Sequence, residues 1–176
     1  MEIIIEAEKE SEYAEIEAVL RGAFWRDGAD EKFNEWVLVS KIRQCGGYLP
    51  ELSLVAKDRE KIVGYIMFNL CTIGGKDSLA LAPLGVLPAY QQKGIGALLV
   101  QKGLKRAKQL GYGSSIVLGS PYYTRFGYLP VPPGIYLSKE LDPHLYYISL
   151  NQQQGHHLEG QVVYCAPFYD KDGNLL

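Results

Sequence analysis

The stretch LGVLPAYQQKGIGALLVQKGLKRAKQL, residues 84–110, decides the fold that the sequence predicts. An apolar run ends at Pro88, a short polar turn follows, and Gly94 and Gly96 open a long amphipathic segment. A strand, a glycine-bearing loop and the start of a helix can direct several unpaired backbone N–H groups at one anion, and the helix dipole adds favourable potential. The sequence therefore predicts a phosphate site in residues 91–97.

Two common nucleotide-binding loops do not fit these glycines. A Walker A loop needs a lysine followed by Ser or Thr after its second glycine, but Ala97 and Leu98 follow Gly96. A dinucleotide-binding loop needs a third glycine near Leu99, early in a parallel βαβ unit. On spacing alone, a tight strand-to-helix turn without a ligand explains the two glycines as well as a phosphate site does.

Composition narrows the class of protein. The 176 residues include 47% hydrophobic residues, enough for one core, and carry a formal net charge of -2. This balance gives no general argument for a nucleic-acid or membrane partner. Cys45, Cys71 and Cys165 lack the paired spacing of a zinc site or a disulfide framework. No apolar run approaches the roughly 20 residues that span a bilayer. We therefore expect one cytoplasmic domain over residues 1–176, with reduced thiols.

Hydrophobic periodicity predicts a mixed α/β chain with a largely antiparallel sheet. Helices are expected over residues 11–26, 30–44 and 94–110, and a shorter helical segment over 120–128. Strands are expected over residues 2–7, 52–57, 61–71, 78–87 and 114–118, with weaker candidates at 135–137, 146–149 and 161–164.

Residues 81–100 resemble motif A of the GNAT superfamily of N-acetyltransferases. The loop of that motif reads Gln or Arg, two residues, Gly, one residue, then Gly or Ala, and Gln91, Gly94 and Gly96 occupy these positions. Residues 123–128, YTRFGY, resemble the family's closing motif, in which an aromatic residue precedes a glycine–aromatic pair. Two motifs at this separation are more specific than either alone.

The resemblance implies the GNAT fold, an α+β arrangement in which a mixed, mostly antiparallel, twisted sheet is flanked by helices. Residues 130–176 would form a C-terminal extension that completes the sheet. Within the superfamily, LGSPYY at residues 118–123 and VVYCAPFYD at residues 162–170 are similar to a bacterial subgroup of mostly uncharacterised acetyltransferases.

The resemblance also implies acetyl-CoA as cosubstrate and a small-molecule or peptide amine as acceptor. By position, the pyrophosphate of CoA would lie on backbone N–H groups of Gln91, Gln92, Lys93, Gly94, Ile95, Gly96 and Ala97. The family's preceding strand splays from its neighbour and leaves main-chain groups for pantetheine, here at Leu84, Gly85 and Val86. A backbone N–H near Val86 could stabilise the oxyanion of the reaction, a contribution of roughly 3 kcal/mol.

Direct attack of a neutral amine on the thioester needs a base for the amine and an acid for the leaving thiolate. Tyr123 matches the family's general-acid position, and a phenol with a pKa of about 10 is protonated at neutral pH. The adjacent Tyr122 is the alternative. The base is not readable from the sequence: Glu35, in the helical region that usually walls the acceptor site, and Asp77 are candidates, and a water chain would serve equally well.

The leading interpretation is therefore an N-acetyltransferase that acts on a primary amine. The alternatives are a non-catalytic CoA or acyl-CoA sensor, and an interaction domain whose loop binds no phosphate. His144, His156 and His157 fit no metal-ligand pattern, so no metal is expected. Cys165 is predicted to be a core thiol because no motif places a His and an acid with it. Exposed strand edges and the aromatic tail are compatible with a homodimer.

Overall fold

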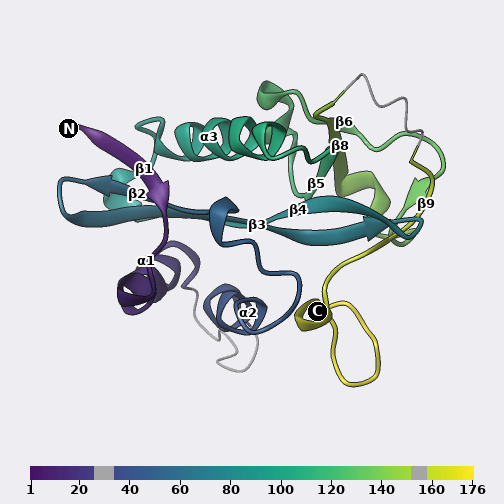
Figure 1. Cartoon of the computed structure of the whole chain (residues 1–176), viewed down its shortest axis with the longest axis horizontal. Helices are drawn as coiled ribbons and strands as arrows, with labels where there is room; N and C mark the ends of the chain where they lie inside the picture. The colour runs from purple at the N-terminus through teal and green to yellow at the C-terminus, as the bar shows by residue number, and fades with distance from the viewer. Residues whose placement is uncertain (26–33, 152–157) are drawn as a thin grey trace.

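The computed structural model describes residues 1–25, 34–151 and 158–176 of the chain. Within them the strands are β1 (Ile3–Ala7), β2 (Ser53–Asp58), β3 (Lys61–Ile73), β4 (Lys76–Val86), β5 (Ser114–Leu118), β6 (Leu129–Pro130), β7 (Ile135–Tyr136), β8 (Leu145–Ser149) and β9 (Gly160–Val163). Their order across the sheet is β1-β2-β3-β4-β5-β8-β6, with β9 beside β3 and β7 beside β9 (Figure 1). Neighbouring strands are antiparallel except for β4–β5 and β7–β9. The prediction of a mixed, mostly antiparallel sheet is confirmed.

Helices cover both faces of this sheet (Figure 1), with α1 (Tyr13–Phe24) and α2 (Glu35–Ile42) on one face and α3 (Ile95–Gln109) on the other. Successive side chains of a strand point to opposite faces. Tyr65 and Met67 of β3 therefore pack beneath α1 and α2, whereas Ile66 and Phe68 pack beneath α3. No helix within the described ranges is long and apolar enough to cross a membrane.

Periodicity located most of these elements to within a few residues. The helix expected over residues 30–44 is observed as α2, and residues 30–33 lie outside the described part of the chain. β6 was not predicted, because it is two residues long and contains Pro130. It forms through pairing of Leu129 with Tyr147 and of Pro130 with Tyr146 in β8. Such a strand depends on its partner and leaves no periodic signal of its own.

The sheet opens between β4 and β5. These parallel strands pair only at Leu79–Ser115 and Ala80–Ile116. Further along, β4 stays paired with β3, and the register of that pairing shifts at Ala82 and Pro83. The Nδ2 amide of the buried Asn69 donates to the carbonyl of Ala82 at 3.2 Å and holds the bulged segment against β3. The β5 side of β4 is thereby left unpaired from Leu81 onward, beside the start of α3.

Gly103 sets how closely α3 approaches the sheet. A Cβ at this position would lie 2.2 Å from Cε2 and 2.9 Å from Cζ of Phe68, whose side chain is fully buried. Gly to Ala inside a helix normally gains up to about 1 kcal/mol. We expect Gly103→Ala instead to lower the free energy of unfolding by about 1–3 kcal/mol, because the ring cannot move away in a packed core. Urea denaturation measures this change.

Gly22 in α1 is the matched control. A Cβ there would meet Cδ2 of Leu87 at 2.9 Å, the far end of a flexible side chain that can rotate away. Gly22→Ala should therefore leave the free energy of unfolding within about 1 kcal/mol of wild type. Equal stability of the two variants would contradict the tight contact between α3 and β3.

Candidate active site

The loop between β4 and α3 exposes a set of backbone donors. Gly94, with φ 83, is the N-cap of α3, and Gln92 has φ 61, so two left-handed residues turn the chain into the helix. The side-chain amide of Gln91 donates to the carbonyl of Val86 at 2.9 Å and fixes the loop to the end of β4. The N–H groups of the first helical turn, residues 95–97, have no acceptor within the helix. They form an anion-binding concavity supported by the helix dipole.

Leu84 and Val86 direct main-chain groups toward the opening in the sheet. The N–H of Leu87 donates to the carbonyl of Val63 at 2.9 Å. Because bonded and non-bonded pairs alternate in an antiparallel ladder, the Gly85–Tyr65 pair is also a bonded one. The N–H and C=O groups of Leu84 and Val86 therefore point away from β3, toward the gap.

Gly85 does not line the site, in contrast to its prediction as a pantetheine contact. Its missing side chain faces α1, where a Cβ would lie 3.0 Å from Cε2 of Phe24 and 3.2 Å from Cβ of Ala23. Glycine is required here for the close approach of α1 to β4. The motif could not show that Gly85 differs from its two neighbours. The alternating direction of successive residues along a strand decides which of three consecutive residues faces the gap.

The donors and the gap belong to one groove with a volume of about 550 Å³. Its lining includes eight of the ten residues predicted for the cofactor, Leu84, Val86, Gln91, Gln92, Gly94, Ile95, Gly96 and Ala97, together with Tyr122 and Tyr123. Tyr90, Ser120 and Arg125 also line it and were not predicted. Their positions in the sequence could have indicated them. Tyr90 directly precedes the loop motif, and Ser120 and Arg125 flank the pair of adjacent tyrosines.

Lys93 is the other predicted cofactor residue that is absent from the groove lining. Its Nζ lies 5.4 Å from the ring centroid of Tyr90, and Nζ of Lys61 lies 5.5 Å from the same centroid. The two ammonium groups therefore lie beside the ring of Tyr90, at the mouth of the groove that this ring lines. Their charge contributes to a positive potential at the groove.

The structure separates the two adjacent tyrosines. A Cβ on Gly96 would lie 3.5 Å from the hydroxyl of Tyr122, so this hydroxyl lies at the start of α3. The ring of Tyr123 instead packs at the end of β5, where a Cβ on Gly119 would lie 3.0 Å from its Cε2. Burial raises the pKa of Tyr123 to about 12. Tyr123 is therefore a protonated donor at neutral pH, near the strand that diverges from β4.

Glu35 lies on the opposite side of the gap. It is the first residue of α2 and lines a second pocket of about 380 Å³ with Leu81, Ala82 and Leu118. Its oxygen Oε2 is buried. The groove and this pocket are thus bounded by neighbouring parts of β4 and of the chain around the end of β5.

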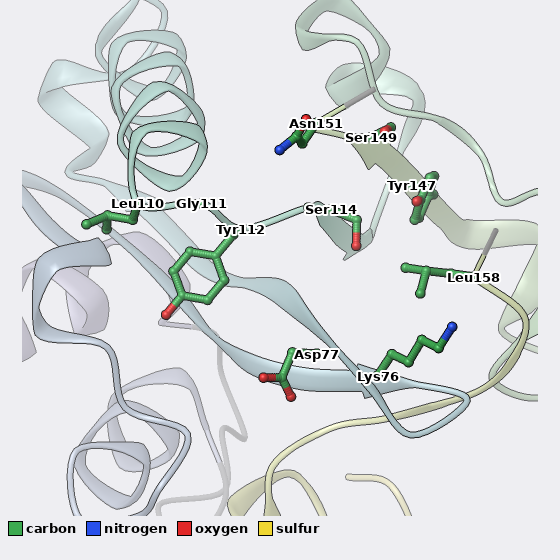
Figure 2. Close-up of a pocket in the computed structure, with 11 residues that line it drawn as sticks. Lys76, Asp77, Leu110, Gly111, Tyr112, Ser114, Tyr147, Ser149, Asn151 and Leu158 are labelled. Carbon is green, nitrogen blue, oxygen red and sulfur yellow. The ribbon is translucent and has the colours of Figure 1, made fainter. Parts of the chain in front are cut away.

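Asp77, the other candidate base, lies at the far end of β4. Figure 2 shows it in a separate pocket with Lys76 and Tyr112, near the segment that follows α3. Ala82 lies five positions further along the strand, a span of about 17 Å. Asp77 is therefore too distant from the gap to act as the base.

His144 and Cys165 are absent from the described lining of both pockets. The carbonyl of His144 accepts the N–H of Gly119 at 2.9 Å, and His156 and His157 are outside the described residues. The thiol of Cys165 donates to Oδ1 of Asn69 at 3.6 Å. Burial raises the pKa of Cys165 to about 12, which keeps this thiol protonated and unreactive at neutral pH.

A mixed sheet that opens beside a helix N-terminus, with a phenol at the opening, is the architecture of an acyltransferase of the GNAT type. The model of the Acetyltransferase (GNAT) family matches residues 9–128. The chain therefore belongs to the GNAT family, and the resemblance found in its two motifs is confirmed.

Two Escherichia coli K12 proteins resemble the chain in sequence. Both are named as uncharacterised N-acetyltransferases: YjhQ is 38% identical over 98 residues, 53% of this chain and 54% of that protein. YhbS is 36% identical over 117 residues, 64% of this chain and 65% of that protein. The chain thus aligns with about half to two thirds of the length of these relatives.

Two solved structures share the fold over nearly the whole chain. The structure of E. coli YhbS in complex with CoA has a TM-score of 0.83 and 27% identity, and covers 94% of this chain and 91% of its own. A GNAT family acetyltransferase from Brucella melitensis in complex with acetyl-CoA has a TM-score of 0.77 and 28% identity, with coverage of 95% and 98%. The predicted GNAT fold is confirmed.

Proposed function

We propose that this protein is an N-acetyltransferase that moves an acetyl group from acetyl-CoA to a primary amine. The observation that carries the proposal is the groove itself, which joins the donor loop before α3, the unpaired edge of β4 and Tyr123 in one surface. In this proposal residues 1–176 act as one N-acetyltransferase domain, and residues 130–176 supply β8 next to β5 and part of the acceptor-side wall.

The groove suits the chemistry of CoA at both ends. The N–H groups of residues 95–97 and the lysines at the mouth are matched to the pyrophosphate, since a helix N-terminus stabilises anions. The outward N–H and C=O groups of Leu84 and the N–H of Val86 are matched to the amides of pantetheine, whereas the carbonyl of Val86 already accepts from Gln91. The complexes of YhbS with CoA and of the Brucella protein with acetyl-CoA support this assignment.

The reaction is an exchange of one bond for another. The amine nitrogen attacks the thioester carbon, a C–N bond forms, and the C–S bond breaks, so that the products are an acetylated amine and CoA with a free thiol. Tyr123 gives its phenolic proton to the departing sulfur. The amine loses its proton to Glu35, directly or through water, because the attacking nitrogen becomes acidic as the C–N bond forms. Solvent then restores both side chains.

Binding and turnover test the proposal separately. Calorimetry should detect CoA binding, and a thiol-release assay with acetyl-CoA should show release that depends on an added amine. CoA binding without turnover on mono- and diamines, amino acids or peptides would favour the sensor. Failure to bind CoA at millimolar concentration would contradict both and leave the interaction domain. The acceptor-side pocket retains about 380 Å³ beside the C-terminal segment, which supports the enzyme over a module whose cleft is filled.

Two glycines at the ends of α3 give a matched pair for the loop. Gly94 has φ 83 and Gly111 has φ 90, and a Cβ would meet no atom within 4 Å at either position. Alanine in the left-handed region costs about 1–2 kcal/mol at each site. Of the two variants, we expect only Gly94→Ala to weaken CoA binding, by about tenfold. Gly94 sets the turn that aims the N–H groups of residues 95–97 at the proposed phosphate site, whereas Gly111 lies at the other end of the helix. Equal dissociation constants for the two variants would exclude the loop as the phosphate site.

A further inference from the structure

The bulge in β4 decides which main-chain groups reach the gap. Phe68 of β3 pairs with Leu81 of β4. Two positions earlier on β3, Ile66 pairs with Leu84, which lies three positions further along β4. β4 therefore contains one extra residue over this interval, as in a β-bulge. Beyond the bulge, this shift leaves the main-chain groups of Leu84 and the N–H of Val86 facing the gap.

Without the extra residue, the same strand would present different groups. Leu84 would then pair with Tyr65 and bond to β3, because the N–H and C=O groups of Tyr65 face β4 in every register. Gly85 would face the gap in its place, and the side chain of Leu84 would point toward α1. The one-residue shift is therefore a condition for the pantetheine contacts assigned to β4.

Asn69 is the side chain that bonds to the bulge. It belongs to β3 and is fully buried, and its Nδ2 amide donates to the carbonyl of Ala82 at 3.2 Å. Ala82 and Pro83 are the two residues of β4 that lie between the pairs on either side of the shift. The bond thus ties β4 to β3 at the point where the register changes. Loss of the donor would remove this tie and leave a carbonyl acceptor without its partner.

Cys165 contacts the other end of the same amide. Its thiol donates to Oδ1 of Asn69 at 3.6 Å. Because a carbonyl oxygen can only accept, Nδ2 must face Ala82, and the thiol meets the oxygen end of the amide. Cys165 directly follows Tyr164, which lines the pocket around Glu35. The C-terminal segment therefore reaches the bulge through one buried side chain that is absent from the described lining of the groove.

We propose that Asn69 is a positioning residue for the pantetheine arm of acetyl-CoA, and that Cys165 orients its amide for this role. The inference rests on the proposed acetyl transfer and adds to it a residue outside the described lining of the groove. Asn69 acts through Ala82 on the direction of the main-chain groups of Leu84 and Val86. The pyrophosphate depends instead on the loop before α3, so loss of Asn69 should affect one arm of CoA and not the other.

Two ligands separate the two arms of CoA. The first is CoA itself, and the second is 3′-phosphoadenosine 5′-diphosphate, which is CoA without pantetheine. Calorimetry on the whole chain measures both dissociation constants. Asn69→Leu removes both polar ends of the side chain at a similar size. We expect this variant to bind CoA about tenfold more weakly, as for the loss of one buried hydrogen bond, and to bind the nucleotide as wild type does.

Cys165 provides a second pair of variants that leaves Asn69 in place. Cys165→Ala removes the donor to the amide, and Cys165→Ser supplies a hydroxyl donor at the same position. The affinity for CoA should fall severalfold in Cys165→Ala and recover in Cys165→Ser, while nucleotide affinity stays constant. This pair decides the question alone if Asn69→Leu does not fold.

Ser114→Ala is the matched control. Ser114 of β5 is buried, and its hydroxyl forms a 2.7 Å hydrogen bond with that of Ser78 in β4. The substitution therefore also removes a buried bond to β4, but at the end where β4 and β5 remain paired. Its affinities for both ligands should equal those of wild type.

The outcomes separate the positioning role from the activity. Unchanged CoA affinity in Asn69→Leu, or equal losses for CoA and the nucleotide, overturns the role of Asn69. No change in Cys165→Ala, or a loss that Cys165→Ser does not recover, overturns the orienting role of Cys165. These results leave the proposed function intact when wild type binds CoA and releases thiol. A selective loss of CoA affinity without turnover in wild type would support the positioning role and contradict acetyl transfer, and failure of wild type to bind CoA would contradict both.

Discussion

Tyr123→Phe should lower kcat by about 10²–10⁴-fold, the usual contribution of a positioned general acid. The substitution removes one oxygen and leaves the ring packed against Gly119 and Tyr128, where the centroids of Tyr123 and Tyr128 are 6.0 Å apart. The dissociation constant of CoA should therefore remain close to that of wild type. Thiol release and calorimetry on the same preparation measure the two quantities.

Tyr122→Phe is the comparison that decides between the adjacent phenols. Its hydroxyl lies beside Gly96 at the start of α3, so its loss should weaken CoA binding by less than about tenfold, as for one hydrogen bond, and leave kcat nearly unchanged. A large loss of kcat in Tyr122→Phe, with normal turnover in Tyr123→Phe, would reverse the assignment.

The pH profile adds a readout of the same acid. Because burial raises the pKa of Tyr123 to about 12, the phenol keeps its proton below pH 11. The kcat/KM of wild type should rise between pH 7 and 10 as an amine of pKa about 10 loses its proton. No descending limb from Tyr123 is expected in this range. A fall in activity centred near pH 9 that is absent from Tyr123→Phe would contradict the raised pKa.

Glu8→Ala should lower the free energy of unfolding by about 3–5 kcal/mol, because it leaves a buried guanidinium without its carboxylate. The side chain of Glu8 is fully buried, with Oε2 2.7 Å from Nη2 of Arg43, and Oε1 accepts from Tyr48 Oη at 2.6 Å. The guanidinium of Arg43 also lies 3.6 Å from the ring centroid of Tyr13. The network joins the end of β1 to α1 and the end of α2. Chemical denaturation measures the loss, which corresponds to a Tm lower by roughly 10 °C.

Glu17→Ala is the matched control for that carboxylate. Glu17 pairs with Arg21 at 2.9 Å, but their side chains are 50% and 40% exposed, and such pairs contribute about 0–1 kcal/mol. The double variant Glu8→Leu with Arg43→Met should recover much of the stability, because it removes both buried charges. Equal losses in Glu8→Ala and Glu17→Ala would show that the buried pair does not stabilise the fold.

Local sequence pattern was sufficient for most of the elements and for the loop before α3. The strand, loop and helix of residues 84–110 are encoded by near neighbours: apolar spacing sets α3, and Gly94 supplies the left-handed turn before it. The motif residues Gln91, Gly94 and Gly96 all line the groove for the same reason. The motif could not place Gly85 or Lys93, because the direction of a strand residue or a loop side chain depends on the partner strand and on neighbours such as Tyr90.

The tertiary structure alone separated the two candidate bases. Glu35 and Asp77 were both candidates in the sequence, and the structure places Glu35 beside the gap between β4 and β5 and Asp77 at the far end of its strand. The pocket around Glu35 is closed by Phe168, which comes from the other end of the chain. The sequence by itself determined the family and the glycine-bearing loop before α3, since both depend on short spacings. The pocket around Glu35 depends on contacts between distant segments, and these exist only once the sheet has brought the segments together.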